Sequence, residues 1–233
     1  ILVGRSARKT EAVAREIGAD AHFVADYARL DDVRRLASEI RGSVDRIDAL
    51  ANNAGGVFGE RTATVDGNEK TFQVNLLAPF LLTHLLLDRL RAGDGVVVNT
   101  SSASARILGK IDVDDLNHEK TYGPMRAYSD AKLANILFAH GLHTRYGSSG
   151  INAVAFDPGN VRTNFGADNN GFLTRLLYRT PLSRFALISP AKGGANLAYF
   201  LTGAPGVDWQ PGHFYAQQKL ATPRQTNKQV RDE

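Results

Sequence analysis

The stretch Val96-Val97-Val98-Asn99-Thr100-Ser101-Ser102 decides the fold class. Its apolar residues are consecutive and do not alternate with polar ones, so both faces of the strand that they predict over residues 95–100 must be buried. Four other short apolar runs have the same character, at residues 1–4, 21–25, 47–52 and 151–156. Because such strands are typical of parallel sheets covered by helices, we expect an α/β fold with a doubly wound, Rossmann-type parallel sheet in a single domain.

The segments between these strands carry apolar residues at helical spacing. They predict helices over residues 7–17, 30–40, 67–90, 126–146 and 190–201, the first one capped by Ser6. Residues 212–215 predict a last strand. We therefore place the cofactor-binding and catalytic domain at residues 1–215, and we expect residues 216–233 to form a polar C-terminal tail that is exposed or disordered.

Composition excludes several classes of protein. The 233 residues are 43% hydrophobic and 22% charged, as in ordinary soluble globular proteins, and no apolar run is long enough to span a membrane. The absence of cysteine excludes a disulfide framework and thiol chemistry, and it fits a cytoplasmic location. The net charge of +4 is dispersed, unlike that of a nucleic-acid groove. His140 and His143 lack a third metal ligand nearby in the sequence, so we expect no metal site.

Tyr128 and Lys132 are four residues apart in a helix-forming run, Ala127-Tyr128-Ser129-Asp130-Ala131-Lys132, and therefore project from one helical face. An ammonium about 4 Å from a tyrosine oxygen favours the phenolate by roughly 4 kcal/mol at an effective dielectric constant of about 20. That is about 3 pKa units, enough for proton exchange near neutral pH. Taken alone, such a pair is more typical of a solvated helix face.

Other polar residues gather at one edge of the predicted sheet. Five of them fall at or just after the carboxyl end of a strand, namely Arg5, Asp26, Asn52, Ser102 and Pro158. Ligands of doubly wound sheets bind at this edge, so one crevice could collect all five residues.

In their order along the chain, the motifs resemble the short-chain dehydrogenase/reductase family over nearly the whole sequence. The resemblance is carried by Asn52-Asn53-Ala54-Gly55, Asn75, Ser101-Ser102, Tyr128 with Lys132, and Asp157-Pro158-Gly159 followed by Thr163. Residues 111–123, between Ser102 and Tyr128, resemble the retinol-dehydrogenase-like subgroup. The family's glycine-rich turn, Thr-Gly-x-x-x-Gly-x-Gly, does not occur in this sequence. We therefore expect the first strand-helix unit to lie outside residues 1–233, and these residues alone to aggregate or to bind cofactor poorly.

The resemblance implies hydride transfer between NADP(H) and a carbonyl or alcohol carbon of a small molecule. It assigns Tyr128 as general acid/base, Ser102 as hydrogen-bond partner of the substrate oxygen, and Lys132 as the cation that lowers the pKa of Tyr128 and binds ribose hydroxyls. Asn75 would order a relay water, or alternatively pair with backbone as a structural asparagine. A homodimer or homotetramer built on long helices is also implied. The alternative function is a catalytically silent, dinucleotide-sensing protein of the same fold, and the intact Tyr128 and Lys132 pair argues against it.

The family's cofactor contacts fall, in this sequence, on Arg5, Asp26, Asn52, Ala54, Gly55, Tyr128, Lys132, Pro158, Gly159, Val161 and Thr163. Arg5 stands where an arginine pairs with the 2′-phosphate of NADP and an acidic residue binds the ribose of NAD, so the sequence favours NADP(H) over NAD(H). The alternatives are a solvated Arg5 and an Asp26 that caps a turn. Four apolar residues could form a lid over a lipophilic substrate or belong to the core: Phe165, Phe172, Leu176 and Leu177.

Overall fold

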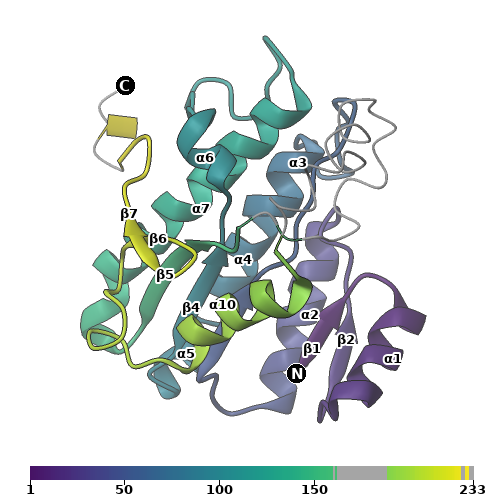
Figure 1. Ribbon diagram of the computed structural model, residues 1–233. Helices are drawn as coiled ribbons and strands as arrows, with labels where there is room; N and C mark the ends of the chain where they lie inside the picture. Colours follow the sequence, from purple (N-terminus) through teal and green to yellow (C-terminus); the bar gives the residue numbers. More distant parts are fainter. Residues whose placement is uncertain (160, 162–187, 227–228, 231–233) are drawn as a thin grey trace.

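A computed structural model describes residues 1–159, 161, 188–226 and 229–230 (Figure 1). Its central feature is a sheet in the order β3-β4-β5-β6-β7, in which the first four strands are parallel and β7 pairs antiparallel with β6. The strands are β3 (Ala49–Asn52), β4 (Val96–Thr100), β5 (Asn152–Asp157), β6 (Phe214–Ala216) and β7 (Lys219–Ala221). The doubly wound α/β fold expected from the sequence is therefore confirmed.

A second, two-stranded parallel sheet joins β1 (Leu2–Gly4) to β2 (His22–Val24). Among the described residues, no strand pairs with the free edge of β3, where Ala49 and Ala51 are exposed. Close packing requires glycine at position 4, because a Cβ atom there would lie 2.2 Å from Oγ1 of Thr10 in the first helix. The edge of β3 therefore leaves backbone hydrogen-bonding groups without a strand partner among the described residues.

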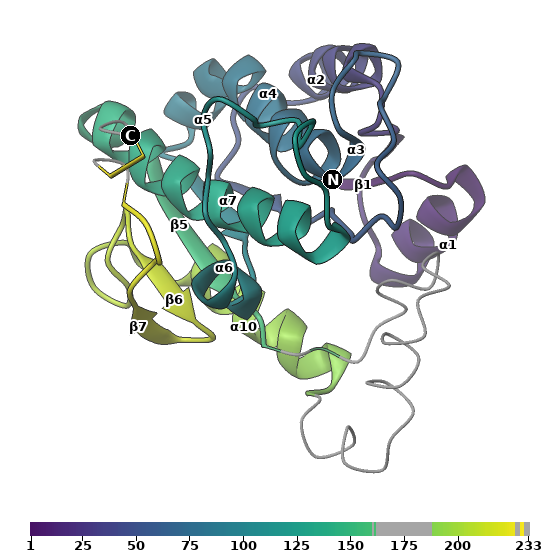
Figure 2. The same ribbon diagram turned by 90° about the horizontal axis from the view of Figure 1, so that it is seen from above.

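Helices cover both faces of the five-stranded sheet. Figure 2 shows α2, α4, α5 and α7 on one face and α10 on the other. The helices are α1 (Ala7–Ile17), α2 (Leu30–Ser43), α3 (Lys70–Phe72), α4 (Ala78–Leu85), α5 (Leu87–Ala92), α6 (Ala103–Ile107), α7 (Pro124–Tyr146) and α10 (Pro190–Thr202), with a π-helical segment η1 (Gln73–Leu77) and a 3-10 turn η2 (Gly147–Ser149).

Strand β4 explains why both faces must be apolar. Val97 packs into the core formed with α2, α4 and α7, whereas Val96 and Val98 pack into a second core with Phe200 of α10 and Trp209. Successive strand residues point to opposite faces, so a strand between two helical layers needs an apolar residue at every position. This burial places the polar end of β4, Asn99 to Ser102, at the edge where the parallel strands end.

The helix predicted over residues 67–90 is wrong in detail. Gly67 lies in a turn with φ +80°, and helical structure begins at Lys70, after Glu69 caps the backbone N–H groups of Thr71 and Phe72. The segment then passes through the π-helical η1 and breaks at Leu86, whose φ of −106° and ψ of 8° separate α4 from α5. The spacing of apolar residues predicts the buried stripe but not these local departures.

The predicted C-terminal tail contains regular structure. Strand β7 adds to the sheet edge beside β6, and the Gln225 side chain further along is buried. Among the described helices, none has the length and apolarity needed to cross a membrane. The cytoplasmic location stays a prediction from the sequence.

Candidate active site

Ser101 and Ser102, at the end of β4, point their hydroxyl groups in different directions. The Oγ atom of Ser101 donates to the Lys132 carbonyl at 2.7 Å and is buried against α7. Ser102 faces the other way and caps α6, its Oγ accepting from the Ser104 backbone N–H at 3.2 Å. A hydroxyl that accepts at a helix N-terminus still has its own proton to donate. The Ser102 hydroxyl is therefore a hydrogen-bond donor at the carboxyl edge of the sheet.

Helix α7 carries the tyrosine and the lysine. Gly123 is the N-cap and Pro124 occupies the first turn, where the missing N–H of proline costs nothing. As the four-residue spacing predicts, Lys132 and Tyr128 share a face, with the Nζ atom 5.6 Å from the centroid of the tyrosine ring. Both side chains are buried, at 3% and 7% exposure. A cation is thus held close to a phenol in a medium of low dielectric constant.

The ammonium group of Lys132 is buried and hydrogen-bonded to backbone. It donates to the Thr100 carbonyl at 2.9 Å, at the end of β4. Burial lowers the pKa of Lys132 from 10.5 to about 8, because the charged form is desolvated. At pH 7 most molecules still carry the charge, and a modest rise in pH removes it.

The turn after β3 lies directly against this pair. A Cβ atom on Gly55 would lie 2.4 Å from Oδ1 of Asn75 and 3.1 Å from Nζ of Lys132, so only glycine fits without displacing these groups. The close approach unites three of the sequence motifs, which lie far apart along the chain. Ala54 and Gly55 are themselves exposed on the outer side of the turn.

The side chain of Asn75 is fully used by backbone. Its Nδ2 donates to the carbonyls of Gly56 and Thr71, each at 2.8 Å, and its Oδ1 accepts the Gly56 N–H at 3.0 Å. This is the arrangement that the alternative interpretation, a structural asparagine, predicted. A relay water at Asn75 would therefore have to bind the main-chain carbonyl, which also accepts from Nδ2 of Asn135 at 2.9 Å.

Sequence reasoning missed two residues that shape this carbonyl. Pro79 lies four residues after Asn75, and because proline has no N–H it cannot form the helical hydrogen bond to the Asn75 carbonyl. Asn135 supplies the donor instead, from α7. Both signals were present in the sequence: a proline inside a helical pattern, and an asparagine three residues after Lys132 in a helix that disfavours asparagine.

Three predicted cofactor residues lie at other strand ends. Arg5 is exposed just after β1, where its guanidinium is open to a phosphate. Asp26 follows β2, and its Oδ1 accepts the Ala28 N–H at 3.0 Å, so it caps a turn as the alternative predicted. Asn52 ends β3 but donates inward, to Thr83 and to Asn99 at 3.0 and 2.9 Å. Its buried Oδ1 has no hydrogen-bond partner among the described residues.

The segment after β5 forms a constrained turn. Gly159 has a φ of +90°, a conformation that favours glycine, and its N–H donates to Oδ1 of Asp157 at 3.0 Å. Val161 forms a single bridge with Ile188 and packs close to Gly193. Pro158 stands between these positions, and its carbonyl accepts from Asn196 at 3.2 Å.

Thr163 lies outside the described residues, as do the four residues predicted to form a lid, Phe165, Phe172, Leu176 and Leu177. Their assignments stay predictions. The structure brings together Asn75, Gly55, Lys132 and Tyr128 with the end of β4, and it places Arg5 and Asp26 at the ends of β1 and β2. The exposed arginine, the small residues of the β3 turn and the Gly159 turn fit a nucleotide cofactor along the carboxyl edge of the strands.

Comparisons with known proteins show the family to which the chain belongs. The chain matches the model of the short chain dehydrogenase family over residues 1–172. It is 38% identical over 228 residues to "Putative daunorubicin C-13 ketoreductase DnrU" of Streptomyces sp. (strain C5), covering 95% of this chain and 75% of that protein. It is 39% identical over 173 residues to retinol dehydrogenase 13 of Homo sapiens, covering 71% of this chain and 52% of that protein.

A solved structure shares the fold. The NADPH bound carbonyl reductase from chicken fatty liver superposes with a TM-score of 0.67 at 19% identity, covering 94% of this chain and 85% of that one. The present chain spans between 52% and 61% of the length of the retinol dehydrogenases 13 and 14 that it matches. The family match, the relatives and the fold together show that this chain belongs to the short-chain dehydrogenase/reductase family of oxidoreductases, which use a nicotinamide dinucleotide, and to its retinol-dehydrogenase-like subgroup.

Proposed function

We propose that the protein is an NADP(H)-dependent oxidoreductase that interconverts a carbonyl and an alcohol on a lipophilic small molecule, with Tyr128 as general acid/base. One observation carries the proposal. The Lys132 ammonium lies 5.6 Å from the Tyr128 ring centroid, both side chains are buried, and the ammonium donates to the Thr100 carbonyl at the end of the strand that leads to Ser102. A solvated helix face would leave these side chains exposed.

Tyr128, Lys132 and Ser102 each have a different role in proton transfer. Tyr128 holds the proton that a carbonyl oxygen gains on reduction, or takes it from an alcohol on oxidation. Lys132 favours the phenolate that remains after the proton has left. The Ser102 hydroxyl donates to the substrate oxygen and fixes it near Tyr128. The bound NADP(H) supplies or accepts the hydride.

Arg5 supports NADP(H) over NAD(H). Its side chain is exposed at the carboxyl end of β1 and can pair with a phosphate in a bidentate manner. In this proposal Asp26, Asn52, Ala54 and Gly55 line the cofactor on the β2 and β3 side. Pro158, Gly159, Val161 and Thr163 line it on the β5 side, while Tyr128 and Lys132 bind the ribose hydroxyls.

Two observations support a lipophilic substrate. Relatives are named as a retinol dehydrogenase and as a daunorubicin C-13 ketoreductase. Predicted lid residues Phe165, Phe172, Leu176 and Leu177 are apolar, and an apolar lid favours an apolar ligand.

The test is NADPH oxidation by the full-length enzyme with a panel of ketones and aldehydes, comparing the wild type with Tyr128→Phe. We expect Tyr128→Phe to lose turnover by at least about a hundredfold, because proton transfer by a positioned side chain contributes about that much or more. Cofactor affinity, measured by NADPH fluorescence, should change little. Tyr146→Phe, at the other end of α7, is the matched control and should keep its activity.

Two results would count against the proposal. Turnover retained by Tyr128→Phe would remove the residue from the mechanism. A wild type that binds NADPH but reduces no carbonyl in the panel would favour the catalytically silent, dinucleotide-sensing alternative.

A further inference from the structure

The hydroxyl group of Ser104, two residues after Ser102, is directed at the Ser102 side chain. Its Oγ donates to Oγ of Ser102 at 3.2 Å, and the Ser104 backbone N–H donates to the same oxygen at 3.2 Å. Both residues are half-buried, just beyond the carboxyl end of β4. The Ser102 oxygen therefore receives two hydrogen bonds from a single residue of α6.

This hydrogen bond differs from the usual one for a hydroxyl group in a helix. Serine and threonine side chains in helices commonly donate to the carbonyl four residues earlier. Three other helical hydroxyl groups of this chain do so, at 2.6–2.8 Å, namely those of Thr83, Ser129 and Thr144. For Ser104 that carbonyl belongs to Thr100, which lies in β4 and accepts from Nζ of Lys132. Because Ser104 lies in the first turn of α6, it has no helical carbonyl to bind, and its hydroxyl group binds Ser102 instead.

The two accepted hydrogen bonds use both lone pairs of the Ser102 oxygen. A hydroxyl group has one proton to donate and two lone pairs that accept, so the proton is the only hydrogen-bonding capacity that Ser102 has left. Among the described residues, no acceptor takes this proton. Hydrogen bonds accepted by a hydroxyl oxygen also strengthen the one that it donates, because they polarise the O–H bond. Ser104 therefore leaves Ser102 to act as a donor alone.

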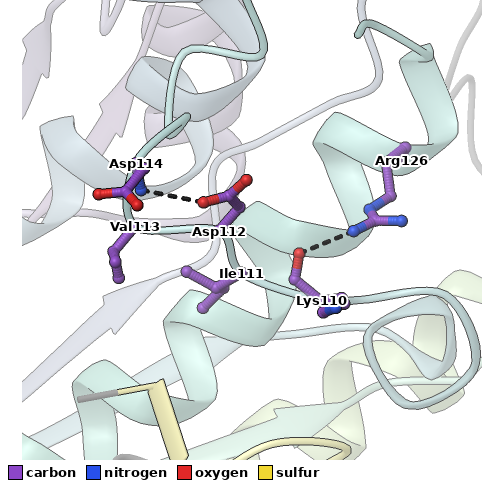
Figure 3. A pocket seen from close by; sticks show the side chains of 6 residues that line it. All are labelled: Lys110, Ile111, Asp112, Val113, Asp114 and Arg126. Carbon is purple, nitrogen blue, oxygen red and sulfur yellow. Dashed lines mark hydrogen bonds between the residues drawn. The ribbon is translucent and has the colours of Figure 1, made fainter. Parts of the chain in front are cut away.

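Helix α6 is held in place by groups other than the Ser104 hydroxyl. At its first turn, the buried carboxylate of Asp157 accepts the Ala103 backbone N–H. Beyond its last turn, Arg126 of α7 donates to the Lys110 carbonyl at 3.0 Å, as Figure 3 shows. Loss of the Ser104 hydroxyl should therefore leave the backbone of α6 in place.

We propose that Ser104 is a positioning residue that fixes the Ser102 hydroxyl as a hydrogen-bond donor to the substrate oxygen. The inference rests on the proposed function, in which Ser102 donates to that oxygen. Hydride transfer to a carbonyl places negative charge on the oxygen, so a donor that is already oriented stabilises the transition state more than the bound substrate. Removal of the Ser104 hydroxyl should therefore lower the rate of the chemical step more than it lowers the affinity for substrate.

The experiment is a double-mutant cycle in the full-length enzyme, with Ser104→Ala, Ser102→Ala and the double variant. Steady-state kinetics use NADPH and the ketone or aldehyde of the panel that wild type reduces fastest. Single-turnover oxidation of NADPH reports the chemical step apart from product release. Ser104→Thr keeps the hydroxyl group and is the rescue variant. Ser149→Ala removes a hydroxyl group that donates to the Tyr146 carbonyl, beyond the C-terminal end of α7, and is the control.

We expect Ser104→Ala to lower kcat and the single-turnover rate by about three- to tenfold, the range for one hydrogen bond, and to change KM by less than about twofold. In the Ser102→Ala background the same substitution should have little further effect on either rate, because the group through which Ser104 acts is gone. Ser104→Thr should keep most of the wild-type rate, and Ser149→Ala should match wild type.

Three outcomes would overturn the inference while leaving the proposed function in place. The first is an active wild type whose rates are unchanged in Ser104→Ala. The second is an equal loss of rate in the wild-type and Ser102→Ala backgrounds, because Ser104 would then act through the structure of α6. The third is an equal loss in Ser104→Ala and Ser104→Thr, because the hydroxyl group would then not be the cause. A wild type that reduces no carbonyl would instead overturn the proposed function, and the inference with it.

Discussion

The substitution Lys132→Met separates what the buried ammonium costs in stability from what it contributes to chemistry. Burial lowers the pKa of Lys132 to about 8, whereas the unfolded chain keeps the ordinary value of 10.5. Between these pH values the unfolded state binds more protons than the folded state, so the free energy of unfolding rises with pH in this window. The difference amounts to about 3 kcal/mol in all, of which about 2.5 kcal/mol falls between pH 7 and pH 10.

The methionine variant has no titratable group at position 132. Its free energy of unfolding, relative to wild type, should therefore fall by about 2.5 kcal/mol between pH 7 and pH 10. Urea unfolding followed by fluorescence of Trp209, the single tryptophan and a buried one, measures both proteins at each pH. Lys192→Met, at an exposed position of α10, is the control and should follow the wild-type pH dependence.

At neutral pH, Lys132→Met should lower activity, although it removes the stability cost of the buried charge. A charge 5.6 Å from the tyrosine ring favours the phenolate by about 3 kcal/mol at an effective dielectric constant of about 20. Its removal should raise the pKa of Tyr128 and lower kcat/KM at pH 7 about a hundredfold. Parallel stability curves for the two proteins, together with unchanged kcat/KM, would refute the buried-cation account of the site.

Three further substitutions test the surroundings of the pair. Gly55→Ala places a Cβ 2.4 Å from Oδ1 of Asn75. We therefore expect the free energy of unfolding, measured with urea, to fall by about 1–3 kcal/mol, and kcat to fall as well. Glu69→Ala removes the carboxylate that caps two N–H groups of α3. The free energy of unfolding, measured by thermal unfolding, should therefore fall by about 1–2 kcal/mol. Pro79→Ala restores a donor for the Asn75 carbonyl; we expect kcat to fall at least about threefold, because the regained N–H competes with Asn135, and an unchanged kcat would contradict this.

Much of the fold could be predicted because burial on two faces leaves a mark in the sequence. Strands β4 and β5 are apolar at consecutive positions, and the predicted helix over residues 7–17 matches α1 at both ends. The helix predicted over residues 67–90 failed at its ends and its middle. Periodicity reports which residues are buried, but a π-helical turn and a break at Leu86 keep the same residues buried and so leave the pattern unchanged.

The candidate site likewise has one part that local sequence rules predict and another part that they do not. The pairing of Tyr128 with Lys132 follows from helical spacing, which is a local rule. The contacts of Gly55 with Asn75, and of Gln225 with Ile111, join segments far apart in sequence, and no local pattern encodes them. The family resemblance assigned Gly55 and Asn75 to one site, but it did not predict their contact. Nothing in a polar segment indicated that Gln225 would be buried.

The π-helical segment η1 shows why a departure from regular geometry is needed at this site. In a regular α-helix the Asn75 carbonyl would accept the backbone N–H of the residue four positions later. Pro79 removes the helical donor, and the wider η1 turn allows the carbonyl to accept from Asn135 of α7. The Asn75 side chain, meanwhile, binds Gly56 beside the Gly55 turn. One residue thus ties the turn after β3 to α7, the helix that carries Tyr128 and Lys132.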